Sequence, residues 1–230
     1  MGYDPTAPLI VQGDRSVLVE VDNPRYSQAR DAIAPFAELE KSPEHIHTYR
    51  LTPLSIWNAA AAGTTAEEIV ESLRKFSKFP IPQNLVTDIG ELAARYGRVR
   101  LQRTGDGLVL ECTDPALMEE LARQKEVGKF LGTRLDSQHY CIEDRFRGVL
   151  KQALIGIGYP VEDLAGYVAG ADLPLATRSI TQTGKTFVIR DYQRDAADAF
   201  WAGGQVRGGS GVIVLPCGAG KTIVGIAAMA

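Results

Sequence analysis

The sequence predicts a chain of the α+β class with more than one domain. Segments that alternate like strands recur between segments with the spacing of helices, and neither type dominates. The chain has 230 residues, of which 45% are hydrophobic, so it can build more than one core. A stretch over residues 166–185 has few large apolar side chains and is expected to be a linker. We therefore expect three parts, covering residues 1–125, 126–183 and 184–230.

The first part is expected to begin with two strands and a helix. Residues 9–12 and 16–21 are apolar and β-branched on either side of a short polar turn, which is the pattern of a hairpin. Residues 23–34 predict a helix, with Asn23 as its N-cap and a proline in its first turn. Residues 45–51 alternate like a further strand.

Three helices and a hairpin follow, an order that predicts a winged-helix-like region. Thr52 begins the first helix, Thr64 or Thr65 caps the second, and the third follows the prolines at 80–82. Residues 98–111 then read as a hairpin, the wing. Such folds often bind DNA. The basic side chains that give a possible DNA-binding edge are Arg74, Lys75, Lys78, Arg98, Arg100 and Arg103. A protein-docking role for the region is an alternative, because fold alone does not define function.

The second part is expected to be a small α+β domain, preceded by a helix over residues 114–125. Its strands are predicted at 129–135 and 139–143, and Asp144 is expected to cap a helix that ends near Gly156 or Gly158. In the third part, residues 187–189 read as a strand, and a helix is expected from about Arg194 to Trp201.

A phosphate-binding loop is predicted near the end of the chain. A β-branched strand at 211–215 breaks into Pro216-Cys217-Gly218-Ala219-Gly220-Lys221-Thr222. The glycines allow a polyphosphate to approach the backbone N–H groups, and the helix opening near Lys221 adds the positive end of its dipole. Lys221 can reach the outer phosphates and the Thr222 hydroxyl can bind Mg²⁺. Leu215 stands where the strict pattern has glycine, so the match is partial. These residues predict ATP binding.

Two further features bear on this loop. Gly184-Lys185-Thr186 also contains the Gly-Lys-Thr triplet, but no strand precedes it and no helix follows it, so we expect a surface turn there. Gln193, by contrast, lies on a helix ahead of the loop. Its amide can both donate to and accept from the edge of adenine, which a carboxylate or a lysine cannot do.

Arg190-x-Tyr192-Gln193 followed by the phosphate loop resembles the start of a superfamily 2 helicase core, and the similarity is to the XPB helicases. Upstream, His45-x-His47-x-Tyr49-x-Leu51-Thr52 and Leu73-Arg74-Lys75-x-Ser77-Lys78 resemble the amino-terminal domain of that family. The resemblance implies an ATP-dependent DNA helicase or translocase with 3′ to 5′ polarity, acting in nucleotide excision repair or DNA opening. It implies a damage-recognition-like domain at 126–183 and the first elements of an α/β RecA-like lobe at 184–230.

The resemblance also implies roles for individual residues. Arg190 and Gln193 would hold adenine, Lys221 would act catalytically and Thr222 would bind magnesium; the phosphate contacts implied are Cys217, Gly218, Ala219, Gly220 and Lys221. The implied partners are DNA and either a repair nuclease or subunits of a transcription and repair factor. The sequence contains no Asp-Glu-x-His element, which that family uses for phosphoryl transfer, so we expect this chain alone not to hydrolyse ATP.

Two other classes of function remain open at this point. A non-enzymatic adaptor that docks DNA or proteins would explain the architecture without the loop. A nucleotide kinase or transporter ATPase would explain the loop but not Gln193.

Composition excludes several further classes. The formal net charge is −3, so any contact with DNA is expected to be local. The three cysteines are far apart in sequence, which argues against a disulfide framework and for a reducing, cytoplasmic location. The resemblance to a DNA helicase implies association with the nucleoid if the protein is prokaryotic. No apolar stretch is long enough to span a membrane. His45 and His47 share one strand face, but with His139 as the only other histidine an ordinary polar face is favoured over a metal site.

Overall fold

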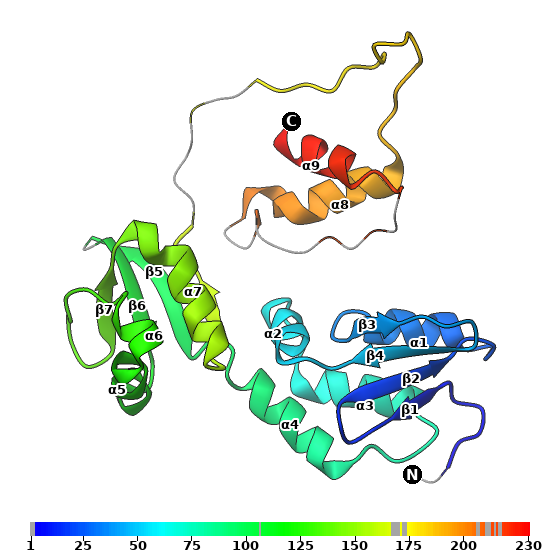
Figure 1. The fold of residues 1–230 in the computed structure, drawn as a ribbon, viewed down its shortest axis with the longest axis horizontal. Coiled ribbons are helices and arrows are strands. Elements are labelled where there is room, and N and C mark those ends of the chain that lie inside the picture. Colours follow the sequence, from blue (N-terminus) through cyan, green and yellow to red (C-terminus); the bar gives the residue numbers. More distant parts are fainter. Residues whose placement is uncertain are drawn as a thin grey trace. The chain divides into compact units, whose positions relative to one another are not determined.

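The computed structural model describes residues 3–230 apart from 106, 167–170, 172, 173, 206, 207, 210–212, 214, 216 and 217. Two compact units make up the chain, Met1–Glu162 and Asp163–Ala230, and each is described by itself. The class is α+β, as predicted: the described residues contain two four-stranded sheets together with helices (Figure 1). In this part of the chain, every helix is too short or too polar to cross a membrane.

The first sheet has the strand order β1-β2-β4-β3 and is antiparallel throughout. The predicted pair of strands is confirmed as β1 (Leu9–Val11) and β2 (Ser16–Glu20), and the third predicted strand as β4 (Ile46–Arg50). Strand β3 (Glu38–Lys41) was not predicted. All four of its residues are exposed at the edge of the sheet, so it lacks the apolar alternation that marks a half-buried strand.

Helix α1 (Tyr26–Ile33) begins later than the sequence indicated. Asn23 was expected to cap the helix, but its side-chain Oδ1 accepts a hydrogen bond from the backbone N–H of Arg25 at 2.9 Å and so forms a turn before the helix. Short side chains of this type compete with helix formation by bonding the nearby backbone. The proline at position 24 therefore lies ahead of the first helical turn and outside it.

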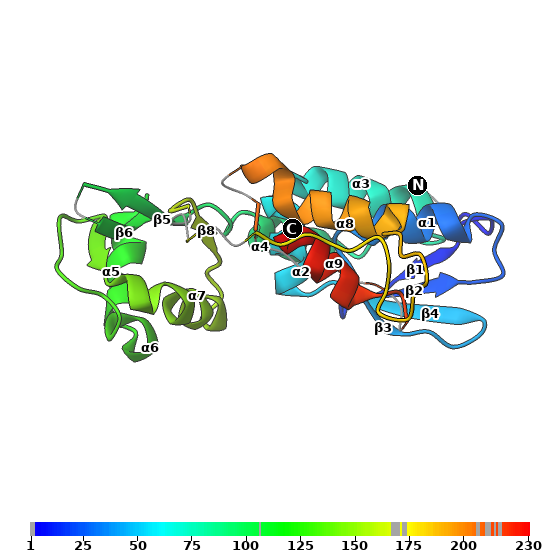
Figure 2. The ribbon, with the colours of Figure 1, turned by 90° about the horizontal axis from the view of Figure 1, so that it is seen from above.

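The three helices predicted after the first sheet are confirmed as α2 (Pro53–Ala61), α3 (Ala66–Phe76) and α4 (Gln83–Ala93). Thr52 and Thr65 cap the first two helices. The hydroxyl oxygen of each accepts a hydrogen bond from the backbone N–H three positions on, and its own backbone N–H donates to the side chain of that residue. Their apolar faces share a core with the first sheet; its fully buried members include Leu9, Ile56, Ile69, Leu73, Leu85 and Ile89. In Figure 2, α1 and α3 lie along one side of that sheet.

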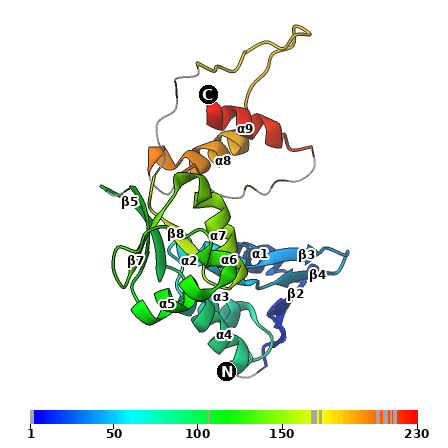
Figure 3. The ribbon, with the colours of Figure 1, turned by 60° about the vertical axis from the view of Figure 1, so that its left-hand side comes forward.

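The second sheet has the order β7-β6-β5-β8. It contains the predicted hairpin as β5 (Val99–Thr104) and β6 (Gly107–Cys112), together with β7 (His139–Ile142) and β8 (Val161–Asp163). The helices of this region are α5 (Pro115–Arg123), α6 (Lys125–Gly128), the 3-10 turn η1 (Asp144–Phe146) and α7 (Arg147–Gly156). Helices α5, α6 and α7 lie on one face of the sheet (Figure 2, Figure 3).

The winged-helix arrangement is not confirmed. The core shared by α2, α3 and α4 ends near Leu92, and the hairpin that was expected to be their wing pairs on both sides with other strands. Leu108 pairs with Ile142 across β6 and β7, so the second sheet crosses the boundary expected near residue 125. The sequence predicts a hairpin because its two strands and turn are adjacent along the chain. It does not predict which strands from other parts of the chain pair with that hairpin.

The strand expected at 129–135 is not formed, apart from a single bridge between Arg134 and Tyr140. The backbone N–H groups of Phe130 and Leu131 donate to the carbonyls of Val127 and Gly128, so the start of the segment is a helical turn. These donors are committed locally and cannot enter a sheet.

The second unit consists of an extended segment and two helices, α8 (Asp191–Trp201) and α9 (Lys221–Met229), with a short turn η2 (Ala202–Gly204) after α8. The strand expected at 187–189 is absent, and Val188 is 71% exposed. Helix α8 begins at Asp191, three residues before the expected Arg194. The surface turn predicted at Gly184-Lys185-Thr186 is confirmed by a bridge between Ile180 and Thr186. The strand expected at 211–215 falls largely outside the described residues.

Candidate nucleotide-binding site

The candidate site lies where the loop before α9 meets the first turn of α8, wholly within the second unit. Helices α8 and α9 lie side by side in each view (Figure 1, Figure 2, Figure 3). Gly218 and Gly220 have φ angles of +78° and +81°, a backbone region that favours glycine. Lys221 is the first residue of α9, as the sequence predicted. The loop therefore ends at a helix N-terminus, where backbone N–H groups without intrahelical acceptors favour an anion.

Gln193 connects α8 to this loop. Its side chain is buried, and its Oε1 accepts a hydrogen bond from the backbone N–H of Arg190 at 3.1 Å. Its Nε2 donates to the backbone carbonyl of Ala219 at 2.9 Å. One amide thus caps the start of α8 and holds the loop 26 residues further along the chain.

Tyr192 reinforces the same connection. Its hydroxyl donates to the Ala219 carbonyl at 2.8 Å, and the guanidinium of Arg190 lies 3.3 Å from the hydroxyl oxygen. The carbonyl therefore accepts from two side chains of the first turn of α8. Sequence reasoning did not nominate Tyr192, because a tyrosine beside the glutamine carries no sign of which backbone group it contacts. The only available signal was its place between Arg190 and Gln193.

Gly220 is required by two separate features of the loop. An L-residue at its positive φ is strained. A Cβ atom built at this position would also lie 2.5 Å from the Nε2 of Gln193, closer than van der Waals contact allows. At Gly218, a Cβ would meet nothing within 4 Å, so open space adjoins that part of the loop. The loop is tight against α8 on one side and open on the other.

The structure brings together the predicted residues Arg190, Gln193, Ala219 and Gly220, with Lys221 next in sequence. Thr222 follows in the first turn of α9. Cys217 lies outside the described residues. The site has one feature that the sequence did not suggest: both polar groups of the Gln193 amide already have protein partners. A base that bound to this amide would have to share or replace one of them.

The predicted DNA-binding side chains are mostly paired with carboxylates. The nitrogen–oxygen distances are 2.8 Å for Arg98–Asp114 and Arg100–Glu162, 2.9 Å for Arg103–Asp144, 2.5 Å for Lys78–Glu20 and 4.0 Å for Arg74–Glu71. The ammonium of Lys75 lies 5.4 Å from the centroid of the Phe76 ring. A cation beside a carboxylate attracts phosphate less strongly than an isolated one, so the structure adds no support for this edge as a DNA contact.

The histidines do not gather into a metal site. His45 pairs with Asp22 at 2.9 Å, His47 with the hydroxyl of Tyr26 at 2.8 Å, and His139 with a carboxylate three residues away. No cluster of three or more metal-ligating side chains occurs within the residues that the structure describes.

Comparison with known proteins identifies the family. Residues 9–136 match the family described as the helicase conserved C-terminal domain, which is more than half of the chain, and the chain belongs to this family. The match runs from β1 through α6 and ends before the candidate nucleotide site.

The relatives extend the similarity through that site. The chain is 53% identical over 224 residues to the DNA 3′-5′ helicase XPB of Mycobacterium tuberculosis and 50% identical to the protein of the same name from Kineococcus radiotolerans. Each alignment covers 97% of this chain but only 39% and 38% of those two proteins. A more distant relative, 33% identical over 96% of the chain and 32% of its own length, is the general transcription and DNA repair factor IIH helicase/translocase subunit XPB of Antonospora locustae.

Proposed function

We propose that this chain carries the amino-terminal region and the start of the ATPase lobe of an XPB-type DNA helicase or translocase. Its activity would be ATP-dependent with 3′ to 5′ polarity, and its role would lie in nucleotide excision repair or DNA opening. The observation that carries the proposal is the hydrogen bond between Gln193 and the Ala219 carbonyl, which joins an amide suited to adenine to a phosphate-type loop. The names of the relatives support the same class.

ATP fits the residues present. A Cβ at Gly218 would meet nothing within 4 Å, so a phosphate can approach the backbone there, and the N-terminus of α9 supplies N–H groups and a dipole of the right sign. In this proposal Arg190 and Gln193 contact adenine, and the base shares the Gln193 amide with its partners Arg190 and Ala219, while Lys221 contacts the outer phosphates. The other phosphate contacts are Cys217, Gly218, Ala219 and Gly220. The Thr222 hydroxyl contributes an oxygen ligand to Mg²⁺, an ion that usually keeps several waters and few protein ligands.

The catalytic role assigned to Lys221 is electrostatic. A fixed cation at the outer phosphates stabilises negative charge that develops during phosphoryl transfer. The residues that would position water are not in this sequence, which has no Asp-Glu-x-His element. We therefore expect the 230 residues alone to bind ATP weakly and to leave it intact.

The test is the DNA-stimulated ATPase rate of a longer chain that includes both motor lobes. Lys221→Ala should lower the rate by at least roughly 100-fold, the effect of removing one preorganised charge-stabilising group. Lys185→Ala is the matched control, since it removes the lysine of the other Gly-Lys-Thr triplet, which lies in a surface turn. Equal rates for wild type and Lys221→Ala would remove the motor from consideration.

That result would favour the alternative function, a non-enzymatic adaptor that docks DNA or other proteins. The ion pairs of the five basic side chains favour protein over DNA as the partner of such an adaptor. For the motor, the proposed partners are DNA and either a repair nuclease or the subunits of a transcription and repair factor.

A further inference from the structure

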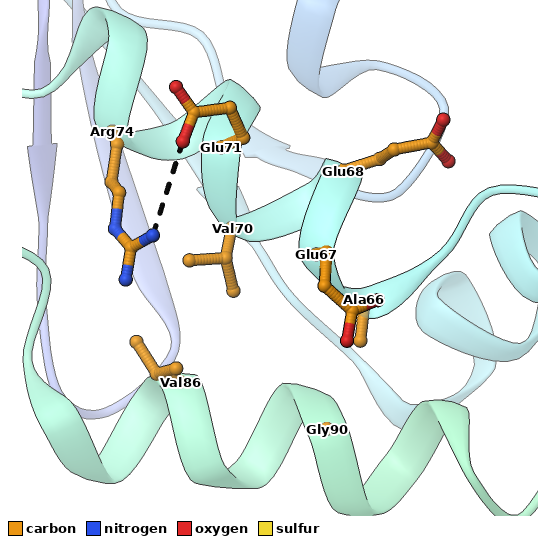
Figure 4. A pocket seen from close by; sticks show the side chains of 8 residues that line it. All are labelled: Ala66, Glu67, Glu68, Val70, Glu71, Arg74, Val86 and Gly90. Atoms are coloured by element: carbon orange, nitrogen blue, oxygen red, sulfur yellow. Dashed lines mark ion pairs between the residues drawn. The ribbon is translucent and has the colours of Figure 1, made fainter.

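A groove runs between helices α3 and α4 in the first unit (Figure 4). Its volume is about 500 Å³, within the range of roughly 300–1,000 Å³ that is usual for ligand pockets. The floor is apolar and consists of Ala66, Val70, Val86 and Gly90. The rim consists of Glu67, Glu68, Glu71 and Arg74, all from α3. We call this site the α3–α4 groove.

Gly90 is the most informative residue of the floor. It lies inside α4, where glycine costs about 1 kcal/mol relative to alanine. No close contact requires its small size, because a Cβ atom at this position would meet nothing within 4 Å, and its φ angle is not positive. The fold of the first unit therefore does not explain the glycine. The missing side chain does deepen the α3–α4 groove.

The rim has an excess of negative charge, carried by Glu67 and Glu71 against Arg74, because Glu68 extends away from α4 in Figure 4. Arg74 lies 4.0 Å from Glu71, a long ion pair with both side chains largely exposed, so it neutralises the rim only in part. Glu68 also accepts a hydrogen bond from the backbone N–H of Thr65 at 2.8 Å, which uses one of its oxygens. Figure 4 shows Glu67 extending from the same turn as Ala66, at one end of the groove.

The apolar floor and the acidic rim of the α3–α4 groove together favour one type of binding partner. DNA is disfavoured because its phosphates would face the glutamates. A second copy of the chain in a two-fold interface would place the same acidic rim against itself. A cationic protein segment is complementary to the rim, and an apolar side chain is complementary to the floor. An amphipathic helix presents both, with apolar side chains at a spacing of three and four residues and lysines or arginines beside them.

We propose that the α3–α4 groove binds a basic amphipathic helix of a partner protein, with one large apolar side chain seated over Gly90 and cations beside Glu67 and Glu71. This goes beyond the proposed motor function and does not rest on it, because the groove and the nucleotide site belong to different units. Failure of the ATPase test would leave the proposal intact.

The experiment uses two fluorescent peptides, each about 18 residues long so that a helix can form. Both carry leucines at helical spacing; one has lysines on the flanks and the other has glutamates. Anisotropy titration against this chain should show saturable binding of the lysine peptide only. Gly90→Leu fills the groove and Glu67→Lys reverses charge on its rim, so each should weaken binding by about tenfold, the effect of removing one central contact.

Glu120→Lys is the matched control, since Glu120 is exposed on α5 and does not line the groove. It makes the same change in net charge and should alter the affinity by less than about twofold. Circular dichroism of Gly90→Leu and Glu67→Lys checks that both variants fold, with Gly90→Ala, which should stabilise α4, as the reference for a small side chain at the same position. The proposal is overturned if the glutamate peptide binds equally well, if binding survives Gly90→Leu, if Glu120→Lys weakens binding as much as Glu67→Lys, or if the lysine peptide does not bind.

Discussion

Replacing Gln193 separates its two structural roles. The side chain accepts from the Arg190 backbone N–H at 3.1 Å and donates to the Ala219 carbonyl at 2.9 Å. Gln193→Ala removes both hydrogen bonds. Gln193→Glu keeps an acceptor for the Arg190 N–H but places a second carboxylate oxygen against the Ala219 carbonyl, where a donor is needed.

The expected magnitude follows from these contacts. A hydrogen bond within a protein contributes about 1 kcal/mol net, so Gln193→Ala should cost the second unit about 2 kcal/mol, which is roughly a 30-fold change in a local opening equilibrium. Gln193→Glu should cost at least about 1 kcal/mol, and all of it should fall on the loop because the cap of α8 is retained.

Amide hydrogen exchange resolves the two effects, because it reports local opening residue by residue. The Arg190 amide should lose protection in Gln193→Ala and keep it in Gln193→Glu. The amides of Ile223 and Val224, which donate to the Gly220 carbonyl at the start of α9, should lose protection in both variants. Equal loss at Arg190 in the two variants, or unchanged protection at the start of α9, would refute the proposed link between α8 and the loop.

Three further predictions follow from single contacts. Gly220→Ala should loosen the loop as much as Gln193→Ala does, since its Cβ would lie 2.5 Å from the Gln193 amide nitrogen at a strained φ of +81°; hydrogen exchange at the amides of Ile223 and Val224 measures this, and unchanged protection there would contradict it. Thr65→Ala removes the cap of α3 and should lower the free energy of unfolding of the first unit by about 1 kcal/mol in a urea titration, whereas no change would mean that the capping box contributes nothing. Burial raises the pKa of the Cys112 thiol, so at pH 8 iodoacetamide should modify Cys112 more slowly than the half-buried Cys141; the reverse order, read by mass spectrometry, would show that β6 opens readily.

Local chemistry explains which elements were predictable. Thr52 and Thr65 cap helices because the hydroxyl oxygen of each accepts a hydrogen bond from the backbone N–H three residues further on, within one turn. A few adjacent residues were likewise enough to predict the turn at Gly184-Lys185-Thr186 and the start of a helix at Lys221. Asn23 shows the limit of such reasoning, because the same residue type can cap a helix or form a turn just before it.

Elements that depend on distant partners were not predictable. Strand β3 was missed for a different reason: it pairs with β4, the next strand along the chain, but all four of its residues are exposed, so it lacks the apolar alternation of a half-buried strand. The hairpin of β5 and β6 was predicted, but its pairing with β7 and β8 was not, and the winged-helix arrangement, which assigned the hairpin to the preceding helices, is not confirmed. Tyr192 was missed in the candidate site for the same reason.

By itself, the sequence determined the class of the chain, most of its helices, and the presence of a glycine loop with Lys221 at the head of a helix. These are properties of residues close together along the chain. Only the tertiary structure decided that Gln193 holds the Ala219 carbonyl and that Gly90 opens a groove between two helices. Both depend on how separate elements pack, α8 against the loop before α9 and α3 against α4, and no local pattern of residues encodes that packing.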